Sequence, residues 1–363
     1  MTSALASPAL ASPLRGIGIV EFEGLGPGPL AGRILADMGA DITLIVRPGA
    51  ASTTEKDDTD LLRRGKRVET LDLKSPDGRA RARALVEEAD GLIEGFRPGV
   101  MERLGLGPSD FASGNPHLVY GRMTGWGQDG PLAQTAGHDL NYVALTGLLP
   151  LSSRDGAAPI VPPTIVGDAS GALGLAFGMV AALLDVGRGA PGRVVDAAIV
   201  DIVAMLGTLV QWLKANGQLA AGRPSAFHDS PFYDVYPCAD GFITVGALEP
   251  QFYALLLERL GLTDVDPAAQ YDTAQWPALK AHMAALFAGR TRAEWSLLLE
   301  GSDVCFAPVL DHDEAARHPH IVSRRAYASD RNGVVRPLAA PRFRPLDDNA
   351  PKDIPGPQSH DSD

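Results

Sequence analysis

The chain has 363 residues, a length that suggests two or more domains rather than one. Its composition, with 45% hydrophobic and 21% charged residues, is ordinary for a soluble globular enzyme with a substantial core. The net charge of -12 argues against a nucleic-acid partner and against a basic patch that would hold the protein on a membrane. The two cysteines, Cys238 and Cys305, are too few for a cysteine-built metal site and fit a reducing compartment, so we expect a cytoplasmic protein.

The ends of the chain and its most apolar run predict neither secretion nor a membrane span. Residues 1–14 lack the basic start and the long apolar core of a signal peptide, so we predict a loose leader. Residues 347–363 are rich in Pro, Asp and Ser and predict a disordered tail. The apolar run at 172–184 is too short and too often broken by glycine to cross a bilayer, which predicts no membrane partner.

The first patterned segment predicts a βαβ unit. Residues 16–22 form an apolar strand, residues 24–29 a turn rich in Gly and Pro, residues 30–38 a helix, and residues 42–46 a second strand. Two strands joined by a helix in this way are typical of a doubly wound, Rossmann-like α/β domain.

The turn at 24–29 has the glycine spacing of a dinucleotide-binding fingerprint, but its chemistry does not fit one. Pro27 and Pro29 remove backbone N–H donors that a pyrophosphate would need. The second strand also ends in Arg47, where an NAD site would carry an acidic residue. Arg47 suits a phosphate, as in NADP or coenzyme A, or is a solvated charge at a strand end.

Elements of the same kind continue along the chain. The pattern predicts a short strand or turn at 71–74, a helix at 78–89, a strand at 91–94, a short helix at 101–105 and a strand at 117–122. Positive charges lie at or beyond the strand ends, at Arg47, residues 64–67, Arg97 and Arg103. Ligands bind at the carboxyl edge of an open α/β sheet, so one ligand with several phosphates explains these charges together. Scattered surface charge is the alternative for any single one.

Two candidate proton carriers stand on either side of the next apolar segment. His138 ends a loop rich in Gly and Thr, and Asp168 follows an extended segment at 161–166 and precedes a helix at 169–184. Taken alone, a loop His is usually a surface residue and an Asp before a helix is usually its N-cap. Together they offer one pocket two groups that can give and take a proton.

The remaining half of the chain predicts a linker and a second domain. Residues 194–214 predict a long apolar helix, residues 242–247 a strand, and Glu249 the start of a helix at 251–260. Residues 264–302 are mostly helical, with Trp276 and Trp295 as core anchors. The His-rich stretch at 311–320 contains a proline between two His, which is poor ligand geometry, so we interpret it as a polar loop and predict no metal site.

Several motifs together resemble the family III CoA-transferases, and within them the alpha-methylacyl-CoA racemase branch. They are GLGPGP at 24–29, RGKR at 64–67, LDLK at 71–74, EGFRPGVMERLGLGP at 94–108, RMTGWGQDGP at 122–131, AGHDLNY at 136–142, VVDAAIVD at 194–201, ADG at 239–241 and VGALEPQFY at 245–253. The likeness runs over residues 16–345. It favours the racemase branch because the family's transferases usually lack a His between the Gly and Asp of the GHD segment.

The resemblance implies a role for particular residues. His138 and Asp168 would be the two acid/base groups, and Glu249 would hydrogen-bond to the His and orient its ring. The acyl-CoA site would be lined by Arg47, Leu71, Asp72, Leu73, Lys74, Gly95, Phe96, Arg97, Arg103, Gly137, Asp139, Leu140, Asn141 and Tyr142. No cofactor is implied, since coenzyme A is part of the substrate.

The resemblance also implies an assembly. Members of the family are interlocked homodimers with active sites built across two subunits, so Glu249 would come from the partner. Residues 1–200, completed by about 335–350, would form a large CoA-binding domain. Residues 201–224 would link it to a small α+β domain at 225–320.

The chemistry fits these residue types. Racemisation next to a thioester carbonyl needs a base on one face of the α-carbon, an acid on the other, and donors aimed at the enolate oxygen. The backbone N–H of Asp168, at a helix start, is a candidate donor. Two alternatives stay open: a CoA transferase in which Asp168 is the nucleophile, and a catalytically silent acyl-CoA-binding relative.

The chain departs from the racemase pattern in three places: ITLIVRP at 42–48, GDASGA at 167–172 and residues 225–233. In relatives the last segment borders the acyl pocket, so the acyl group accepted stays open while the acid/base set is intact.

Overall fold

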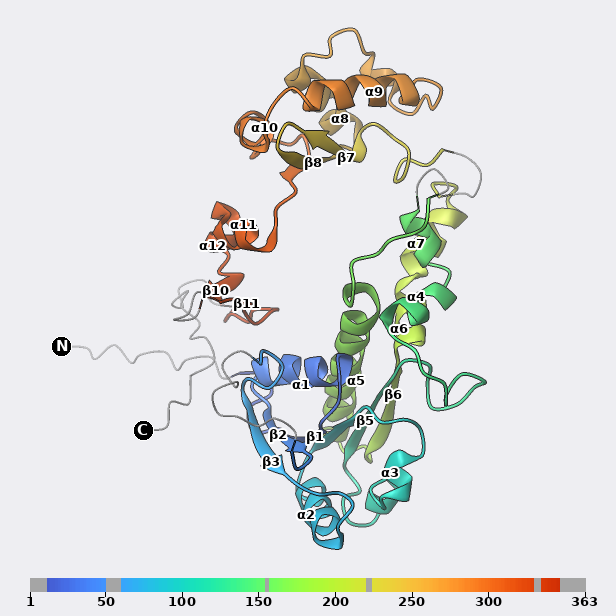
Figure 1. Ribbon diagram of the computed structural model, residues 1–363, viewed down its shortest axis with the longest axis vertical. Coiled ribbons are helices and arrows are strands. Elements are labelled where there is room, and N and C mark those ends of the chain that lie inside the picture. The colour runs from blue at the N-terminus through green and yellow to red at the C-terminus, as the bar shows by residue number, and fades with distance from the viewer. Residues whose placement is uncertain (1–11, 50–59, 154–156, 220–223, 330–333, 347–363) are drawn as a thin grey trace, which may run out of the picture. The chain divides into compact units, whose positions relative to one another are not determined.

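The computed structural model describes residues 12–49, 60–153, 157–219, 224–329 and 334–346 (Figure 1). The predicted disordered tail and most of the predicted leader lie outside these residues. The leader prediction was wrong for Leu14, which is buried in the core and donates its N–H to the Met38 carbonyl at 3.0 Å. By internal contacts the chain forms two units, Met1–Gly207 with Arg336–Asp363, and Thr208–Val335.

A parallel six-stranded sheet in the order β3-β2-β1-β4-β5-β6 forms the centre of the first, larger unit (Figure 1). This order is that of a doubly wound sheet, which confirms the predicted α/β class. The strands are β1 Gly18–Phe22, β2 Asp41–Val46, β3 Lys66–Thr70, β4 Gly91–Glu94, β5 Val119–Thr124 and β6 Arg193–Ala198. The helices are α1 Pro27–Asp37, α2 Pro76–Glu87, α3 Val100–Arg103, α4 Asp139–Leu145, α5 Ser170–Val186 and α6 Ile199–Leu206.

The central strands are apolar along their length because helices cover both faces of the sheet. Alternate residues point to opposite faces: Ile19 packs with α1 and α5, and its neighbour Val20 packs with α2 and α3. Helix α5 approaches β5 closely at Gly121, where an added Cβ would lie 2.7 Å from Met179 Sδ. Each face of the sheet therefore carries its own hydrophobic core, and the two cores fix the strands from which the loops extend.

Three sequence predictions were wrong about element type. Residues 194–214, predicted as one long helix, form β6, then α6, then α7 (Thr208–Ala215). The apolar residues continue across the boundary between β6 and α6, so periodicity does not show where this edge strand ends. Residues 165–166, predicted as extended, belong to a helical turn. The predicted polar loop at 311–320 forms α11 His312–Arg317 and α12 Pro319–Ser323, and Asp311 caps α11 by accepting the Glu314 N–H at 2.7 Å.

The second, smaller unit has an antiparallel three-stranded sheet in the order β7-β8-β9, made of Tyr233–Cys238, Gly241–Gly246 and Phe306–Pro308. Helices α8 Pro250–Leu260, α9 Trp276–Phe287 and α10 Arg292–Leu299 pack on it. Trp276 and Trp295 are buried among these elements, as predicted. A separate pair of short strands, β10 Tyr327–Ser329 and β11 Val335–Pro337, follows.

One helical stretch in the described chain, Ile165–Val186, is long and apolar enough by length and composition to cross a membrane. The prediction for residues 172–184 was wrong on length, because residues 165–169 continue the same helical path. The face that carries Leu175 and Met179 is fully buried on the sheet. Core helices with such a face pass the same test of length and composition.

Candidate active site

The predicted ligand-binding segments follow one edge of the sheet. Since all six strands are parallel, their carboxyl ends lie together, and the order reverses between β1 and β4, where doubly wound folds bind ligands. Arg47 follows β2, Leu71 follows β3, and Gly95 follows β4. The sequence therefore folds so that segments far apart in the chain meet at this edge.

The basic cluster at 64–67 does not belong to that edge, so its predicted contribution to phosphate binding was wrong. Lys66 is the first residue of β3, at the amino end of the strand, and its side chain is fully buried. Arg67 donates to Thr43 Oγ1 at 2.6 Å, and the Arg64 carbonyl accepts from Arg33 Nη1 at 2.7 Å. The charges can be read from the sequence, whereas the end of the strand on which they lie depends on where β3 begins.

Three other arginines follow the carboxyl ends of strands, unlike the basic cluster at 64–67. The side chains of Arg47, Arg97 and Arg103 are exposed and form no ion pair with any described residue. By contrast, Arg81 and Arg122 pair with carboxylates, with N–O distances of 2.7 and 2.8 Å. Unpaired guanidinium groups at the ligand edge of an acidic protein are available for phosphate.

The segments at 71–74 and 95–96 are packed against the core, and only part of each faces solvent. Leu71 and Leu73 pack into the core beside α2. Asp72 Oδ1 accepts the Lys74 N–H at 2.9 Å, which fixes the turn. Phe96 packs edge-on against Phe22 with ring centroids 6.4 Å apart. Asp72, Lys74 and Gly95 are thus the exposed members of these two predicted segments.

A partly buried ion-pair network supports the segment after β4, and the sequence analysis missed it. Arg122 Nε donates to Glu94 Oε1 at 2.8 Å, and Arg122 Nη1 donates to Glu102 Oε1 at 2.7 Å. Glu94 also accepts the Phe96 N–H at 2.7 Å. Burial raises the pKa of Glu94 above its usual range. A glutamate that ends an otherwise apolar strand was the signal available in the sequence.

The loop before α4 is built to present His138. The His138 backbone N–H donates to Asn141 Oδ1 at 3.0 Å, and the Tyr142 hydroxyl donates to the Gly137 carbonyl. Tyr142 packs edge-on against Trp126, with ring centroids 4.7 Å apart. A Cβ at Gly137 would lie 2.8 Å from Tyr142 and 2.9 Å from Trp126, so only glycine fits between the two rings. His138 itself is exposed, as is Leu140.

Asp168 lies in a single π-helical turn, Ile165–Ala169, immediately before α5, and not at the N-cap position that we considered for it. Its carboxylate faces the loop after β1, where Oδ2 is 3.3 Å from the Cβ that Gly26 would carry. Its backbone N–H donates to Asp139 Oδ2 at 2.7 Å. The prediction that this N–H serves the enolate oxygen was therefore wrong, because the donor is already bonded.

The electrostatics of the turn tie these residues together. Burial raises the pKa of the Asp168 carboxyl, the charge of Asp139 raises it further, and His138 acts in the opposite direction. Burial and the charge of Asp168 also raise the pKa of Tyr142. The side chains of His138 and Asp168 form no hydrogen bond with any described residue, so both are available to exchange a proton.

Glu249 belongs to the small unit, where it is exposed between β8 and α8. Burial and the charge of Glu249 raise the pKa of Tyr271. The hydrogen bond expected between Glu249 of one subunit and His138 of its partner stays a prediction. Among the described residues, no cluster of three or more His, Cys, Asp or Glu could hold a metal ion.

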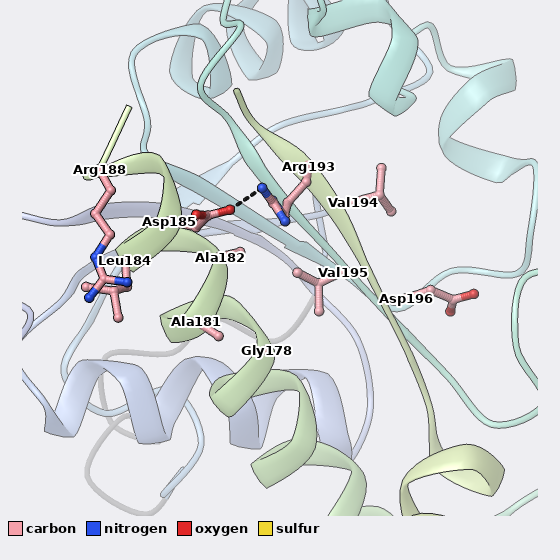
Figure 2. A pocket seen from close by; sticks show the side chains of 10 residues that line it. All are labelled: Gly178, Ala181, Ala182, Leu184, Asp185, Arg188, Arg193, Val194, Val195 and Asp196. Atoms are coloured by element: carbon pink, nitrogen blue, oxygen red, sulfur yellow. Dashed lines mark hydrogen bonds and ion pairs between the residues drawn. The ribbon is translucent and has the colours of Figure 1, made fainter. Parts of the chain in front are cut away.

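A cavity of about 510 Å³ lies elsewhere, between α5 and the edge strand β6 (Figure 2). Asp185 and Arg193 form an ion pair across it. Arg193 begins β6, so this end of the cavity is at the amino edge of the sheet. None of its lining residues belongs to the predicted site.

Comparison with known proteins shows the family and the fold of the chain. Residues 14–358 match the family described as CoA-transferase family III. Alpha-methylacyl-CoA racemase of Mus musculus is 41% identical over 332 residues, which cover 90% of this chain and 86% of that protein. The crystal structure of Rv3272 from M. tuberculosis matches with a TM-score of 0.74 at 27% identity over 92% of this chain and 93% of that one. A CAIB/BAIF family protein from Brucella suis shares the fold, with a TM-score of 0.78 at 24% identity over 95% and 97% of the two chains.

Proposed function

Because the chain belongs to CoA-transferase family III and is similar to alpha-methylacyl-CoA racemase over most of its length, we propose that it interconverts (2R)- and (2S)-2-methylacyl-CoA thioesters. The observation that carries the proposal is the pairing of His138 with Asp168. Both side chains are free of hydrogen bonds to the described residues, and the charge of His138 lowers the pKa of Asp168 against the effect of burial. Such a pair can serve as base and acid in turn.

The reaction proceeds by proton transfer on opposite faces of one carbon. One group of the pair removes the α-proton, and the electron pair left behind moves into the thioester to form an enolate. The other group, which enters the step protonated, returns a proton to the opposite face. In the reverse direction the two residues exchange roles. The raised pKa of Asp168 supports this, because a carboxyl that holds its proton more tightly can act as an acid as well as a base.

The coenzyme A part of the substrate binds along the carboxyl edge of the sheet. Arg47, Arg97 and Arg103 bind its phosphates, which is supported by their exposure and by the lack of carboxylate partners among the described residues. Asp72, Lys74 and Gly95 border the same ligand. Leu71 and Leu73 contribute by shaping the turn, since their side chains pack inward.

The enzyme works as a homodimer in which Glu249 of one subunit reaches His138 of the other. Exposed apolar side chains on α5 and α6 support an assembly: Leu173 is 59% exposed, Phe177 74% and Met205 58%. Apolar surface of this kind on contiguous elements is typical of a protein–protein interface.

The second candidate function is a CoA transfer, in which the Asp168 carboxylate attacks the thioester carbonyl and expels CoA as its thiolate. The Asp168 carboxylate favours it, because this group forms no hydrogen bond with any described residue and faces the loop at Gly26. His138 argues against it, since a nucleophilic carboxylate needs no proton carrier on the opposite face.

One assay separates the two functions. A panel of chiral 2-methylacyl-CoAs is incubated with the protein in heavy water, and both inversion and α-deuterium content are measured. The racemase inverts its substrate and incorporates deuterium. A hydroxylamine-trappable acyl group on Asp168, with no deuterium uptake from any thioester of the panel, would assign the protein as a transferase.

A further inference from the structure

Asp139 connects the two segments that carry the proposed acid/base groups. It is the first residue of α4, directly after His138, and its side chain is buried. Its Oδ2 accepts the Gly167 N–H at 2.8 Å and the Asp168 N–H at 2.7 Å, across 28 and 29 residues of chain. One carboxylate oxygen thus binds the backbone on which Asp168 stands to the backbone that presents His138.

The Asp139 carboxylate lies so close to residue 167 that only glycine fits at this position. A Cβ at Gly167 would lie 2.5 Å from Asp139 Oδ2 and 3.2 Å from the Asp139 Cα. The sequence Gly-Asp at 167–168 therefore supplies two adjacent N–H donors and the space that the carboxylate needs. Hydrogen bonds to an ionised carboxylate are among the stronger ones in proteins, which suits a contact that must hold two loops in register.

We propose that Asp139 is a positioning residue, which fixes His138 and Asp168 relative to each other and does not itself bind substrate. The inference rests on the proposed function, which requires His138 and Asp168 to reach opposite faces of one carbon and so requires a fixed placement of the two residues. The inference gives the two polar residues of the GHD motif at 137–139 different roles. In that motif the His carries the proton and the Asp holds the partner acid in place.

Asp139 also acts through its charge. It is the second cause, after burial, of the raised pKa of Asp168. The elements packed against this turn are α1, α4, α5 and α6. Their charged or titratable groups are Arg33 and Asp37 on α1, Asp139 and Tyr142 on α4, Asp185 on α5 and Asp201 on α6, and His138 is the N-cap residue of α4. Of these, Asp139 is the anion bonded directly to the Asp168 backbone.

Three substitutions separate the bond from the charge. In Asp139→Ala both hydrogen bonds are lost. In Asp139→Asn the amide oxygen can still accept both N–H groups, but the charge is gone. In Gly167→Ala the carboxylate remains and the added Cβ forces the two segments apart. Asp90→Ala is the matched control, because Asp90 Oδ2 accepts the Gly18 N–H at 2.8 Å, 72 residues away, at the amino edge of the sheet.

The readouts are kcat and KM for α-deuterium exchange, with the pH profile of kcat/KM. Misplacement of a catalytic group by roughly 1 Å can cost about 10²-fold in rate, so we expect a kcat loss of that order in Asp139→Ala and Gly167→Ala with KM near wild type. Asp139→Asn should retain most of kcat. Because the charge of Asp139 raises the pKa of Asp168, the acid limb of the kcat/KM profile should move to lower pH in this variant. We expect this shift for the enantiomer whose proton Asp168 removes. Asp90→Ala should keep wild-type kinetics.

Three results would overturn the inference: wild-type kcat in Asp139→Ala, a raised KM with unchanged kcat, or an Asp139→Asn variant as slow as Asp139→Ala. Amide hydrogen exchange at residues 167–168 gives a readout that does not depend on activity. It should accelerate in Asp139→Ala and not in Asp139→Asn. If the wild-type protein exchanges no α-proton, the proposed function fails, while the amide exchange still decides whether Asp139 holds the turn.

Discussion

Lys66 Nζ lies 2.6 Å from Glu21 Oε2, and both side chains are completely buried between the sheet and α1. Lys66 also donates to the Pro29 carbonyl in the first turn of α1 at 2.8 Å. A Cβ at Gly32 would lie 1.8 Å from Glu21 Oε2, so the helix can cover the pair only where it carries glycine. The pair therefore holds the start of α1, and with it the loop at Gly26 that the Asp168 carboxylate faces.

Removing one partner of this pair should destabilise the protein strongly. Lys66→Met leaves the Glu21 carboxylate buried without its cation, which we expect to lower the free energy of unfolding by about 3–5 kcal/mol. The double variant Lys66→Met with Glu21→Leu leaves no buried charge and should recover much of that loss. Urea unfolding measures both. A double variant no more stable than Lys66→Met would contradict this account.

The same pair predicts a pH dependence of stability. Burial raises the pKa of Glu21 from 4.5 to about 7, with Lys66 opposing the rise. The folded state then binds this proton more tightly than the unfolded state does, so its contribution is present below pH 4.5 and is lost as the pH rises to about 7. Unfolding free energy measured across this window should fall with pH less steeply in Glu21→Gln than in wild type. Equal slopes would show that Glu21 does not titrate there.

Binding of coenzyme A should depend on the unpaired arginines. Replacing Arg97 by Ala removes a charge-assisted contact with phosphate, which we expect to weaken CoA binding by about 1.5–3 kcal/mol. Arg47→Ala and Arg103→Ala should act in the same direction. Arg81→Ala is the control, because Arg81 is exposed but already pairs with Glu69 at 2.7 Å. Calorimetric affinities unchanged in all three variants would remove these residues from the site.

The shared-site assembly predicts complementation between two inactive proteins. Mixed dimers of His138→Ala and Glu249→Ala, formed by unfolding and refolding together, would contain one site with both lesions and one site with neither. Activity should therefore return on mixing. Mixtures of either variant with itself are the controls. Heterodimers demonstrated by differential tagging that remain inactive would show that Glu249 does not act across subunits.

The sequence predicted the elements whose pattern is local. The short apolar strand at 91–94 was predicted with the bounds that the structure shows, and Arg47 was placed correctly at the end of its strand. The strand β6 was missed because small and apolar residues, Ala197 to Val200, run across its boundary with α6 without Gly or Pro. Periodicity alone cannot divide such a run.

Contacts between segments far apart in the chain could not be predicted from the sequence. Asp139, Asn141 and Tyr142 were expected to line the substrate site, yet each of these side chains holds the backbone near His138 or Asp168 in place. Trp126, against which Tyr142 packs, was not singled out at all. A motif shows which residues occur together, whereas their division into proton carriers and supports depends on which donors the fold brings within reach.

Deuterium exchange in single variants decides whether His138 and Asp168 serve opposite faces of the α-carbon. Each enantiomer of one 2-methylacyl-CoA is incubated in heavy water with Asp168→Asn or with His138→Gln. A general base contributes about 10²–10⁴-fold, so exchange will be slow but measurable. Asp168→Asn should exchange only the enantiomer whose proton faces His138, and His138→Gln only the other, both without inversion. Exchange of the same enantiomer by both variants, or inversion by either one, would contradict the two-base account.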